Sequence, residues 1–345
     1  MPRLAVVLFN LGGPDRLDAV EPFLFNLFND QAIINLPWPI RPLLARLISR
    51  RRGQKARAIY EQLGGGSPIL PQTEKQASAL ECQLTEHGTN VKVFIAMRYW
   101  HPRADEIALL VKDFAPDEIV LLPLYPQYST TTTASSIADW HRAAHAAELK
   151  TITHSVCCYP IHLSFIQAHA DLIQPAIVEA ERFGKPRVLF SAHGLPKKIV
   201  ARGDPYPWQV KQTAAAVATA LNLSVSDWRV CFQSRVGPLE WIGPSTESEI
   251  ILAGKEGVPL VVVPIAFVSE HSETLVELDI EYRDLALEHG LPAYVRVPAL
   301  GAVDGYIDTL AKLVAQARAG TVVLGTGEKR LCPKDYRCCG QATVI

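Results

Sequence analysis

An acidic stripe follows one strongly apolar segment of this chain. The run Val261 to Phe267 is apolar, and the positions after it carry Glu270, His271, Glu273, Glu277, Glu281 and Asp284. On a helix, like charges three or four residues apart cost about 0.2–0.5 kcal/mol per pair. The stripe therefore needs solvent, basic partners or a cation to offset the repulsion. A solvated helix face is the plain alternative, but open α/β sheets bind ligands where such strands end.

The start of the acidic helix is predicted from a capping box. Thr274 and Glu277 have the spacing of this motif, so we expect the helix to begin at Thr274 and residues 270–273 to stay extended or to form a distorted first turn. Alternate residues of an extended segment project to the same side. The side chains of His271 and Glu273 should therefore project to the same side of the chain.

Another histidine follows another apolar strand. His193 comes two residues after the run Arg187 to Ser191, in the sequence Ser-Ala-His-Gly-Leu-Pro. Parallel strands end at one edge of a sheet, so His193 should approach His271 and Glu273. Imidazole near neutral pH accepts a proton or binds a metal, and two histidines with a glutamate suit a divalent first-row metal. A histidine that only shapes a turn is the alternative.

The seven cysteines are unevenly spread. The three nearest the C-terminus are Cys332, Cys338 and Cys339. These three are one short of the four thiolates that a [2Fe–2S] cluster or a structural zinc needs, and Cys157 or Cys158 could supply the fourth. A reactive tail without metal is the alternative. Cys82 and Cys231 lie in mixed or apolar segments and are predicted to be core thiols.

Composition excludes some classes of protein. A length of 345 residues with 48% apolar content allows one large or two ordinary domains. The 34 basic and 35 acidic residues leave a net charge of -1, which speaks against nucleic acid as a partner. The N-terminus is typical of a first strand of a cytoplasmic protein, and the longest apolar stretch is too short for a transmembrane helix.

Strand-like runs alternate with helix-like segments along the chain, which predicts an α/β fold with parallel sheets. The predicted strands are Leu4–Phe9, Val91–Ala96, Glu118–Leu124, Arg187–Ser191, Trp228–Gln233 and Pro259–Phe267. Similar strand exits in the two halves suggest two Rossmann-like domains of one design. We expect domains at residues 1–150 and 151–320, followed by a cysteine-bearing extension at 321–345.

The glycine-rich segments do not match a nucleotide-binding fingerprint. Leu11-Gly12-Gly13-Pro14 lacks the G-x-G-x-x-G spacing, and Pro14 has no backbone N–H for a phosphate. The segment from Gly64 to Pro68 is predicted to be a flexible turn. No nucleotide cofactor is expected.

The segment 36–52 combines Trp38, an apolar face and clustered arginines. This pattern suits a helix lying on an anionic membrane surface, or the lip of a pocket for a flat anionic ligand. An amphipathic core helix with a basic outer face fits the pattern equally well.

Taken together, the chain resembles the ferrochelatases over nearly all of residues 3–318. The matching motifs are Leu-Gly-Gly-Pro at 11–14, Gly-Gly-Gly-Ser-Pro at 64–68, Arg98-Tyr99 with His101-Pro102, Tyr125–Ser129, Ser191–His193, Gln233–Pro238 with Trp241, and Ser269–Tyr282. The resemblance implies two Rossmann-like domains with the porphyrin between them. It also implies a lyase that inserts Fe²⁺ into protoporphyrin IX, giving haem b and two protons.

The resemblance further implies roles for the acidic stripe. His193 corresponds to the family's proton acceptor and iron ligand, Glu273 to its acidic partner, and His271 supports the pair. Glu277 and Glu281, together with Glu270, would form a carboxylate channel for iron or protons.

Substrate contacts are implied in the same way. The positions that match the porphyrin pocket are Leu11, Leu27, Phe28, Arg52, Tyr60, Ser67, Arg98, Tyr99 and Trp241. Arg52, Tyr60 and Ser67 would hold the propionates, which suits guanidinium–carboxylate geometry. The lip at 36–52 corresponds to a membrane-facing entrance, so peripheral contact with the inner membrane is expected of this cytoplasmic protein.

The tail corresponds to the extension that carries a [2Fe–2S] cluster in some members of the family. The best ligand set is Cys158, Cys332, Cys338 and Cys339, with zinc as the alternative occupant. The animal pattern takes its internal cysteine from a site that holds Ala168 here. Coproporphyrin as the substrate, a non-catalytic haem- or metal-binding role and a homodimer are the alternatives that the sequence leaves open.

Overall fold

The computed structural model describes residues 2–86, 90–235, 237, 239–320 and 330–341. The chain forms two compact units. Unit 1 comprises Met1–Tyr125, Ser129–Cys157 and Leu310–Val323, and unit 2 comprises Pro126–Tyr128, Cys158–Thr309 and Leu324–Ile345. The main point at which the chain leaves unit 1 for unit 2 thus lies a few residues beyond the domain boundary expected at residue 150. Residues from Leu310 onward return to unit 1, whereas the sequence placed residues up to 320 in the second domain.

A four-stranded parallel sheet forms the centre of unit 1, in the order β2-β1-β3-β4. Its strands are β1 (Arg3–Asn10), β2 (Asn90–Met97), β3 (Glu118–Pro123) and β4 (Ile152–Ser155). Apart from Arg3, every residue of β1 is buried. A central strand that is covered on both faces explains the continuous apolar run at this position.

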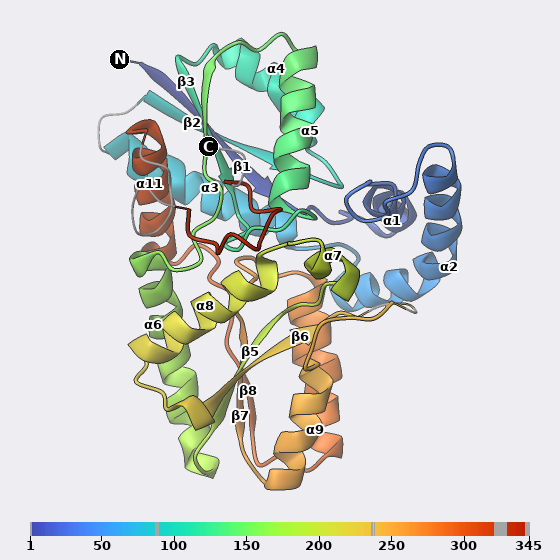
Figure 1. Cartoon of the computed structure of the whole chain (residues 1–345), viewed down its shortest axis with the longest axis vertical. Helices are drawn as coiled ribbons and strands as arrows, with labels where there is room; N and C mark the ends of the chain where they lie inside the picture. Colours follow the sequence, from blue (N-terminus) through green and yellow to red (C-terminus); the bar gives the residue numbers. More distant parts are fainter. Residues whose placement is uncertain (1, 87–89, 236, 238, 321–329, 342–345) are drawn as a thin grey trace. The chain divides into compact units, whose positions relative to one another are not determined.

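The helices of unit 1 lie beside this sheet, with α1 and α2 set apart from it in Figure 1. They are η1 (Leu17–Ala19), α1 (Val20–Phe28), α2 (Ile40–Gln62), α3 (Ile69–Glu86), α4 (Ala104–Phe114) and α5 (Thr133–Ala146). The core between the sheet and α4 and α5 includes Phe9, Phe94, Ile107 and Trp140. Helices α1 and α2 pack together and carry an apolar cluster of their own.

Unit 2 repeats the design, with a parallel sheet in the order β6-β5-β7-β8. Its strands are β5 (Arg187–His193), β6 (Trp228–Gln233), β7 (Leu260–Pro264) and β8 (Tyr294–Arg296). Its helices are α6 (Leu163–Ala180), η2 (Glu181–Phe183), α7 (Lys197–Ala201), α8 (Tyr206–Ala220), η3 (Val225–Asp227), α9 (Thr246–Glu256), the π-helix η4 (Glu273–Glu281) and α10 (Tyr282–Glu288). Helix α11 (Asp304–Arg318) runs from unit 2 into unit 1.

The predicted fold class is confirmed, because both sheets are parallel and share one strand order. All six predicted strands are present. The sequence missed β4 and β8, which are short edge strands whose residues are exposed or half-buried. Such strands lack the continuous apolar run that identified the central ones.

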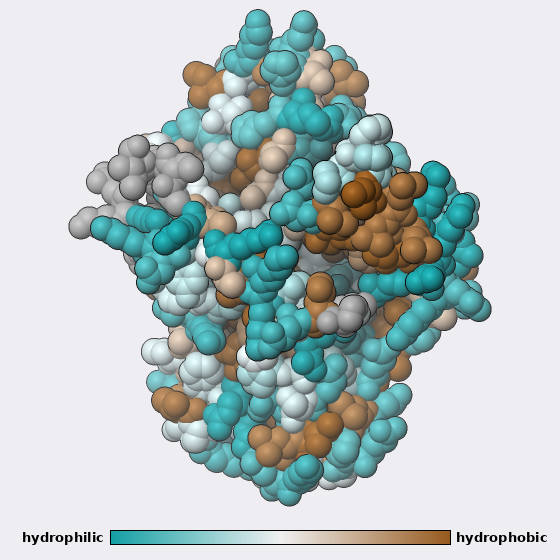
Figure 2. All heavy atoms as spheres, turned by 45° about the vertical axis from the view of Figure 1, so that its right-hand side comes forward, coloured by the Kyte–Doolittle hydropathy of each residue, from teal (hydrophilic) through white to brown (hydrophobic). Residues whose placement is uncertain are grey.

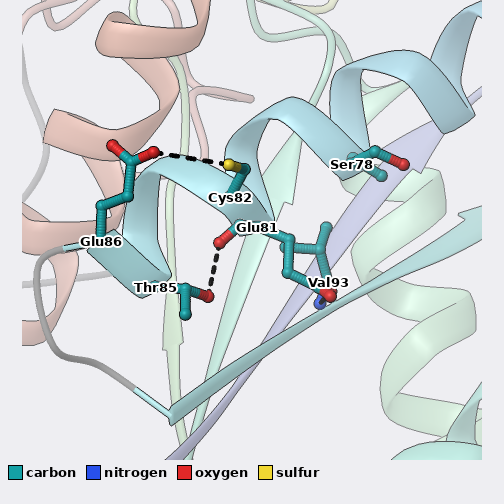
Figure 3. A pocket seen from close by; sticks show the side chains of 7 residues that line it. Ser78, Glu81, Cys82, Thr85, Glu86 and Val93 are labelled. Atoms are coloured by element: carbon teal, nitrogen blue, oxygen red, sulfur yellow. Dashed lines mark hydrogen bonds between the residues drawn. The ribbon is translucent and has the colours of Figure 1, made fainter.

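Edge strand β2 is partly covered by a side chain from α3. The backbone N–H of Val93 donates to Glu81 Oε2 at 2.7 Å, so this edge group is not left unpaired. Figure 3 shows the shallow pocket beside them, where the thiol of Cys82 points toward Glu86. Cys82 is exposed, so its prediction as a core thiol was wrong. Cys231 is fully buried, as predicted.

The two glycine-rich segments of unit 1 pack against each other. A Cβ added to Gly13 would lie 2.6 Å from Ser67 Oγ, and one added to Gly66 would lie 2.6 Å from the Asp15 carbonyl oxygen. The N–H of Ser67 donates to the Pro14 carbonyl at 2.7 Å. These glycines therefore permit a close backbone approach that fixes Ser67 beside the end of β1.

Candidate functional site

The carboxyl edge of the unit 2 sheet gathers the polar residues that follow its strands. His193 ends β5, Gln233 ends β6 beside it, and His271 follows β7 after a short turn. Ligands of parallel sheets bind at this edge. The expected convergence of His193, His271 and Glu273 is present.

The acidic stripe lies on a π-helix rather than an ordinary α-helix. This helix covers Glu273–Glu281, with Ser272 already in helical conformation before it. The expected start at Thr274 was therefore wrong by one or two residues, whereas the expected distortion of the first turn is present. Thr274 Oγ1 accepts a hydrogen bond from the N–H of His271 at 3.0 Å, as the third helical residue of a capping box does. The box is thus displaced by three residues, because His271 rather than Thr274 precedes the helix.

Glu273 lies between the two histidines. Its Oε2 is 3.0 Å from His193 Nδ1 and 3.7 Å from His271 Nε2. The side chains of His193 and Glu273 keep 38% and 26% of their surface exposed, whereas that of His271 keeps 10%. Among the three, His193 and Glu273 can therefore meet a substrate, and His271 supports them from behind.

The surroundings of His193 define its basic nitrogen. Burial works against ionisation of Glu273, but His193 and His271 outweigh it and hold the pKa of Glu273 well below its usual range. Because the ionised carboxylate only accepts, His193 Nδ1 carries the hydrogen and Nε2 is left as the base. Burial lowers the pKa of His193, but the charge and hydrogen bond of Glu273 together with the charge of Glu277 outweigh it, so the net shift is upward.

Glu277 lies one turn further along the π-helix and is held from several sides. Its carboxylate accepts hydrogen bonds from Gln233 Nε2 at 3.0 Å, from the N–H of Ser234 at 2.7 Å and from the Tyr282 hydroxyl at 2.9 Å. The Ser234 hydroxyl donates to it as well. Burial and the charge of Glu273 nevertheless raise its pKa. Of Glu273 and Glu277, it is therefore Glu277 that more readily takes up a proton.

Gln233 connects the strand edge to the π-helix, and sequence reasoning gave it no role. Its Nε2 donates to the Glu273 carbonyl at 2.9 Å as well as to Glu277, and its Oε1 accepts from Ser191 Oγ at 2.7 Å. Gln233 and Ser191 are fully buried. The sequence clues were that Gln233 ends an apolar strand and begins the matching motif Gln233–Pro238. Ser234, which follows it, adopts a positive φ of 59°.

The other acidic residues of the stripe are placed differently. Glu281 is exposed at the far end of the π-helix. Glu270 forms an ion pair with Arg296 at 2.6 Å and accepts from the N–H of Ala299 at 2.9 Å. Arg296 also pairs with Asp279. Glu270 is thus neutralised by an arginine, and a place in a carboxylate channel remains a prediction for Glu277 and Glu281.

Several predicted pocket residues come together in unit 1. Leu11, Leu27 and Phe28 are partly buried against a cluster that contains Tyr60 and Tyr99. The guanidinium of Arg52 lies 5.5 Å from the centre of the Phe28 ring. Burial lowers the pKa of Arg52. Apolar side chains and a partly desolvated cation thus lie side by side, as a flat anionic ligand would require.

Arg98 and Tyr99 belong to a buried ion-pair network. Arg98 donates to Asp30 Oδ2 at 2.9 Å, and the Tyr99 hydroxyl donates to the same oxygen at 2.8 Å. Ser135 joins them through bonds to both Arg98 and Asp30. These contacts position the end of β2, and direct substrate contact by either residue stays a prediction.

Trp241 lies in unit 2, beside the strand end that carries His193. It pairs with Pro196 in a short bridge, and a Cβ added to Gly194 would lie 3.3 Å from its ring. Its indole Nε1 is buried without a hydrogen-bond partner. Trp241 is therefore part of the same strand-end region as the base.

Three of the four predicted cluster ligands converge. Gln209 Nε2 lies 3.4 Å from Cys158 Sγ and 3.1 Å from Cys332 Sγ. A hydrogen bond between Cys332 and Cys339 raises the pKa of Cys332 and lowers that of Cys339. The thiol of Cys338 instead donates to the Arg202 carbonyl at 3.3 Å.

The chemistry of this donor set fits a thiolate-bound group, with Cys158, Cys332 and Cys339 as the assembled part. In the described ranges, however, no set of three or more His, Cys, Asp or Glu side chains has the geometry to hold a metal ion. The Gln209 amide bridges two of the sulfurs, so a bound group would have to displace it. Cys338, one residue from Cys339, would have to turn from Arg202 to complete the set.

Comparisons with known proteins agree with this arrangement. A family model described as Ferrochelatase matches residues 3–318. The ferrochelatase of Caulobacter vibrioides (strain NA1000 / CB15N) is 54% identical over 342 residues, which cover 98% of this chain and 97% of the relative. That of Phenylobacterium zucineum (strain HLK1) is 55% identical over 344 residues, with the same coverage.

A solved structure agrees at the level of fold. The structure of SirB from Bacillus subtilis with Fe³⁺ matches with a TM-score of 0.55 and 14% identity, covering 93% of this chain and 97% of that one. At this identity the likeness concerns the fold alone. The family model and the near full-length sequence matches show that the chain belongs to the ferrochelatase family.

Proposed function

We propose that this enzyme inserts Fe²⁺ into protoporphyrin IX to give haem b and two protons. The observation that carries the proposal is the pair His193–Glu273, in which the carboxylate fixes Nδ1 as the donor and leaves Nε2 as the base. Metal insertion must remove two protons from pyrrole nitrogens. A partly exposed imidazole held by a buried carboxylate suits that task.

The carboxylates behind this pair form the path that we propose for protons or iron. When His193 takes up a pyrrole proton, the charge of Glu273 stabilises the imidazolium. Glu277 has a raised pKa and is held by Gln233, so it is suited to receive protons next. We assign Glu277 this role, with Glu281 at the exposed end as the outlet.

The test is metal insertion by anaerobic protein with protoporphyrin and Fe²⁺, followed by the appearance of haem. Coproporphyrin is measured in parallel, and a preference for it would correct the substrate but keep the reaction. His193→Ala should abolish most of the rate. Insertion rates within a factor of about two of wild type in His193→Ala would instead favour a non-catalytic haem- or metal-binding protein.

We further propose that α2 and the loop before it contact an anionic membrane surface. Trp38 and Leu43 keep 79% and 68% of their surface exposed, and Ile40 and Leu47 are exposed beside them. Figure 2 shows apolar surface gathered over α1 and the start of α2. Arginines of α2 lie close by. None of the described helices is long and apolar enough to cross a membrane.

Binding to phosphatidylglycerol vesicles tests this contact. Removing two exposed apolar side chains in Trp38→Ser/Leu43→Ser should weaken binding about tenfold or more, since each buried side chain contributes about 1.5–3 kcal/mol. Leu163→Ser is the matched control, because Leu163 is equally exposed but lies in unit 2. Equal binding by both variants would reject the proposed contact.

The thiols are proposed to hold a [2Fe–2S] cluster through Cys158, Cys332, Cys338 and Cys339. Such a cluster would supply a one-electron redox centre in unit 2. Anaerobically purified protein should contain iron and sulfide and lose its visible absorption on reduction or in acid. Colourless protein with stoichiometric zinc would identify the alternative occupant.

A further inference from the structure

A chain of buried hydroxyl and amide groups lies behind the His193–Glu273 pair. Ser191 and His193 are alternate residues of β5, so their side chains project to the same side of this strand. Ser191 Oγ donates to Gln233 Oε1 at 2.7 Å, and Thr246 Oγ1 lies 2.9 Å from the same Ser191 oxygen. Ser191, Gln233 and Thr246 are fully buried. These three side chains therefore bond to one another rather than to solvent.

The hydrogen bonds of this chain have a fixed direction. Gln233 Nε2 lies 2.9 Å from the Glu273 carbonyl oxygen, which only accepts, so the NH₂ group of Gln233 faces the π-helix and Oε1 faces Ser191. Oε1 also only accepts, and the single hydrogen of the Ser191 hydroxyl is therefore used in the bond to Gln233. The contact between Ser191 and Thr246 then requires Thr246 as the donor.

Thr246 is held in place for this bond by the start of α9. Its Oγ1 has a second neighbour in Cys231 Sγ at 3.3 Å, but sulfur is a weak acceptor and the Ser191 oxygen is a strong one. Thr246 is the first residue of α9, and Ser245 caps this helix by accepting from the N–H of Ser248 at 3.1 Å. A capped helix end is a rigid support for the Thr246 hydroxyl.

Gln233 connects the two hydroxyls to the π-helix. The side chain of Glu273 is bound by His193 at 3.0 Å, and its backbone carbonyl is bound by Gln233. The same NH₂ group donates to Glu277 Oε2 at 3.0 Å. Without the Ser191 hydroxyl, Gln233 Oε1 would be a buried acceptor without a donor, and the amide could turn away from both glutamates. The Ser191 hydroxyl thus keeps the Gln233 amide directed at the first turn of the π-helix.

We propose that Ser191 and Thr246 are positioning residues, which act through the amide of Gln233 to hold Glu273 and Glu277 in the geometry that metal insertion needs. This role rests on the function proposed above. A misplacement of about 1 Å in a reacting group can cost about 10²-fold in rate. Loss of either hydroxyl should therefore lower kcat and leave the KM for protoporphyrin almost unchanged.

Two substitutions of Thr246 separate its hydrogen bond from its packing. Valine keeps the branched shape but has no hydroxyl, whereas serine keeps the hydroxyl and loses the methyl group. In steady-state kinetics of Fe²⁺ insertion, kcat should fall about fivefold or more in Thr246→Val and stay within about twofold of wild type in Thr246→Ser. The KM for protoporphyrin should stay within about twofold in both. A larger loss in Thr246→Ser than in Thr246→Val would show a packing role and overturn the proposal.

Thr309→Val is the matched control. Thr309 is also fully buried in unit 2, and its hydroxyl donates to the Gly305 carbonyl of its own helix at 2.8 Å. This variant should keep the wild-type kcat. Thermal melting measures the stability of each variant separately. An equal fall in kcat for Thr309→Val and Thr246→Val would show a general effect of losing a buried hydroxyl, and would reject the positioning role.

A double-mutant cycle tests whether the two hydroxyls act in series. Ser191→Ala should lower kcat about tenfold or more, because it removes the bond to Gln233 itself. Thr246 acts only through Ser191, so Thr246→Val should change kcat by less than about twofold in the Ser191→Ala background. Losses that multiply in the double variant would show two independent effects and overturn the chain. If Ser191→Ala does not fold, the two Thr246 variants decide alone.

The outcomes separate this role from the proposed function. An active wild type whose Ser191 and Thr246 variants keep the wild-type kcat rejects the positioning role alone. A wild type that inserts no metal rejects the proposed function, and this role with it. A raised KM with unchanged kcat would place the hydroxyls in substrate binding, and would also overturn the proposal.

Discussion

Replacement of Glu273 by glutamine removes the charge that orients His193 and little else. The bond lost joins Glu273 Oε2 to His193 Nδ1 at 3.0 Å. A hydrogen bond to a charged group contributes about 1.5–3 kcal/mol, which we reduce to about 1–2 kcal/mol because the His193 side chain is 38% exposed and therefore screened. At about 1.4 kcal/mol per tenfold, the imidazolium formed during insertion loses a factor of about 5–30.

The substitution should also lower kcat/KM by changing the tautomer of His193. The amide of glutamine can turn its NH₂ toward Nδ1, which would move the hydrogen of His193 to Nε2 and block proton uptake there. General bases contribute about 10²–10⁴-fold, so the total loss in kcat/KM lies between about tenfold and 10⁴-fold. Glu288→Gln is the control, since Glu288 is exposed at the end of α10.

The pKa of His193 predicts the direction in which Glu273→Gln shifts the pH dependence of kcat/KM. The net pKa of His193 is raised because the charge and hydrogen bond of Glu273, together with the charge of Glu277, outweigh burial, and only the neutral imidazole accepts a proton. In wild type, kcat/KM should therefore fall as the pH drops through a value above the usual histidine range. In Glu273→Gln burial is opposed only by the charge of Glu277, so this acidic limb should move to lower pH. Initial rates of porphyrin metalation over a pH series measure both effects. A loss of less than about threefold, or a limb that stays in place, would refute the reasoning.

Two further predictions concern stability and the porphyrin pocket. Arg296→Met leaves Glu270 and Asp279 without their buried partner. It should therefore lower the free energy of unfolding by about 3 kcal/mol, as measured by urea denaturation. A change below about 1 kcal/mol would mean that solvent already screens these carboxylates. Gly13→Ala should displace Ser67, because the new Cβ would meet its Oγ at 2.6 Å. It should cost about 1–3 kcal/mol of stability and raise the KM for protoporphyrin, and an unchanged KM would remove Ser67 from the porphyrin contacts.

The parts of the site that the sequence predicted depend on local pattern and sheet geometry. His193 and Glu273 each follow an apolar run, and parallel strands end at one edge, so their convergence could be foreseen. The π-helix could not, because its residues also fit an ordinary helix. The predicted helix start at Thr274 was also wrong, because the Thr274 hydroxyl accepts a hydrogen bond from the N–H of His271 instead of capping its own turn.

The sequence by itself determined the alternating strands and helices, the repeated design and the approach of His193 to Glu273, since each of these depends on patterns among neighbouring residues and on the common edge at which parallel strands end. Only the tertiary structure decided which acidic residues are free and which are neutralised, as with Glu270 against Arg296. It also placed Gln209 between two cysteines that are far apart in the chain. Such contacts depend on how distant segments pack, and the spacing of residues along one segment carries no information about them.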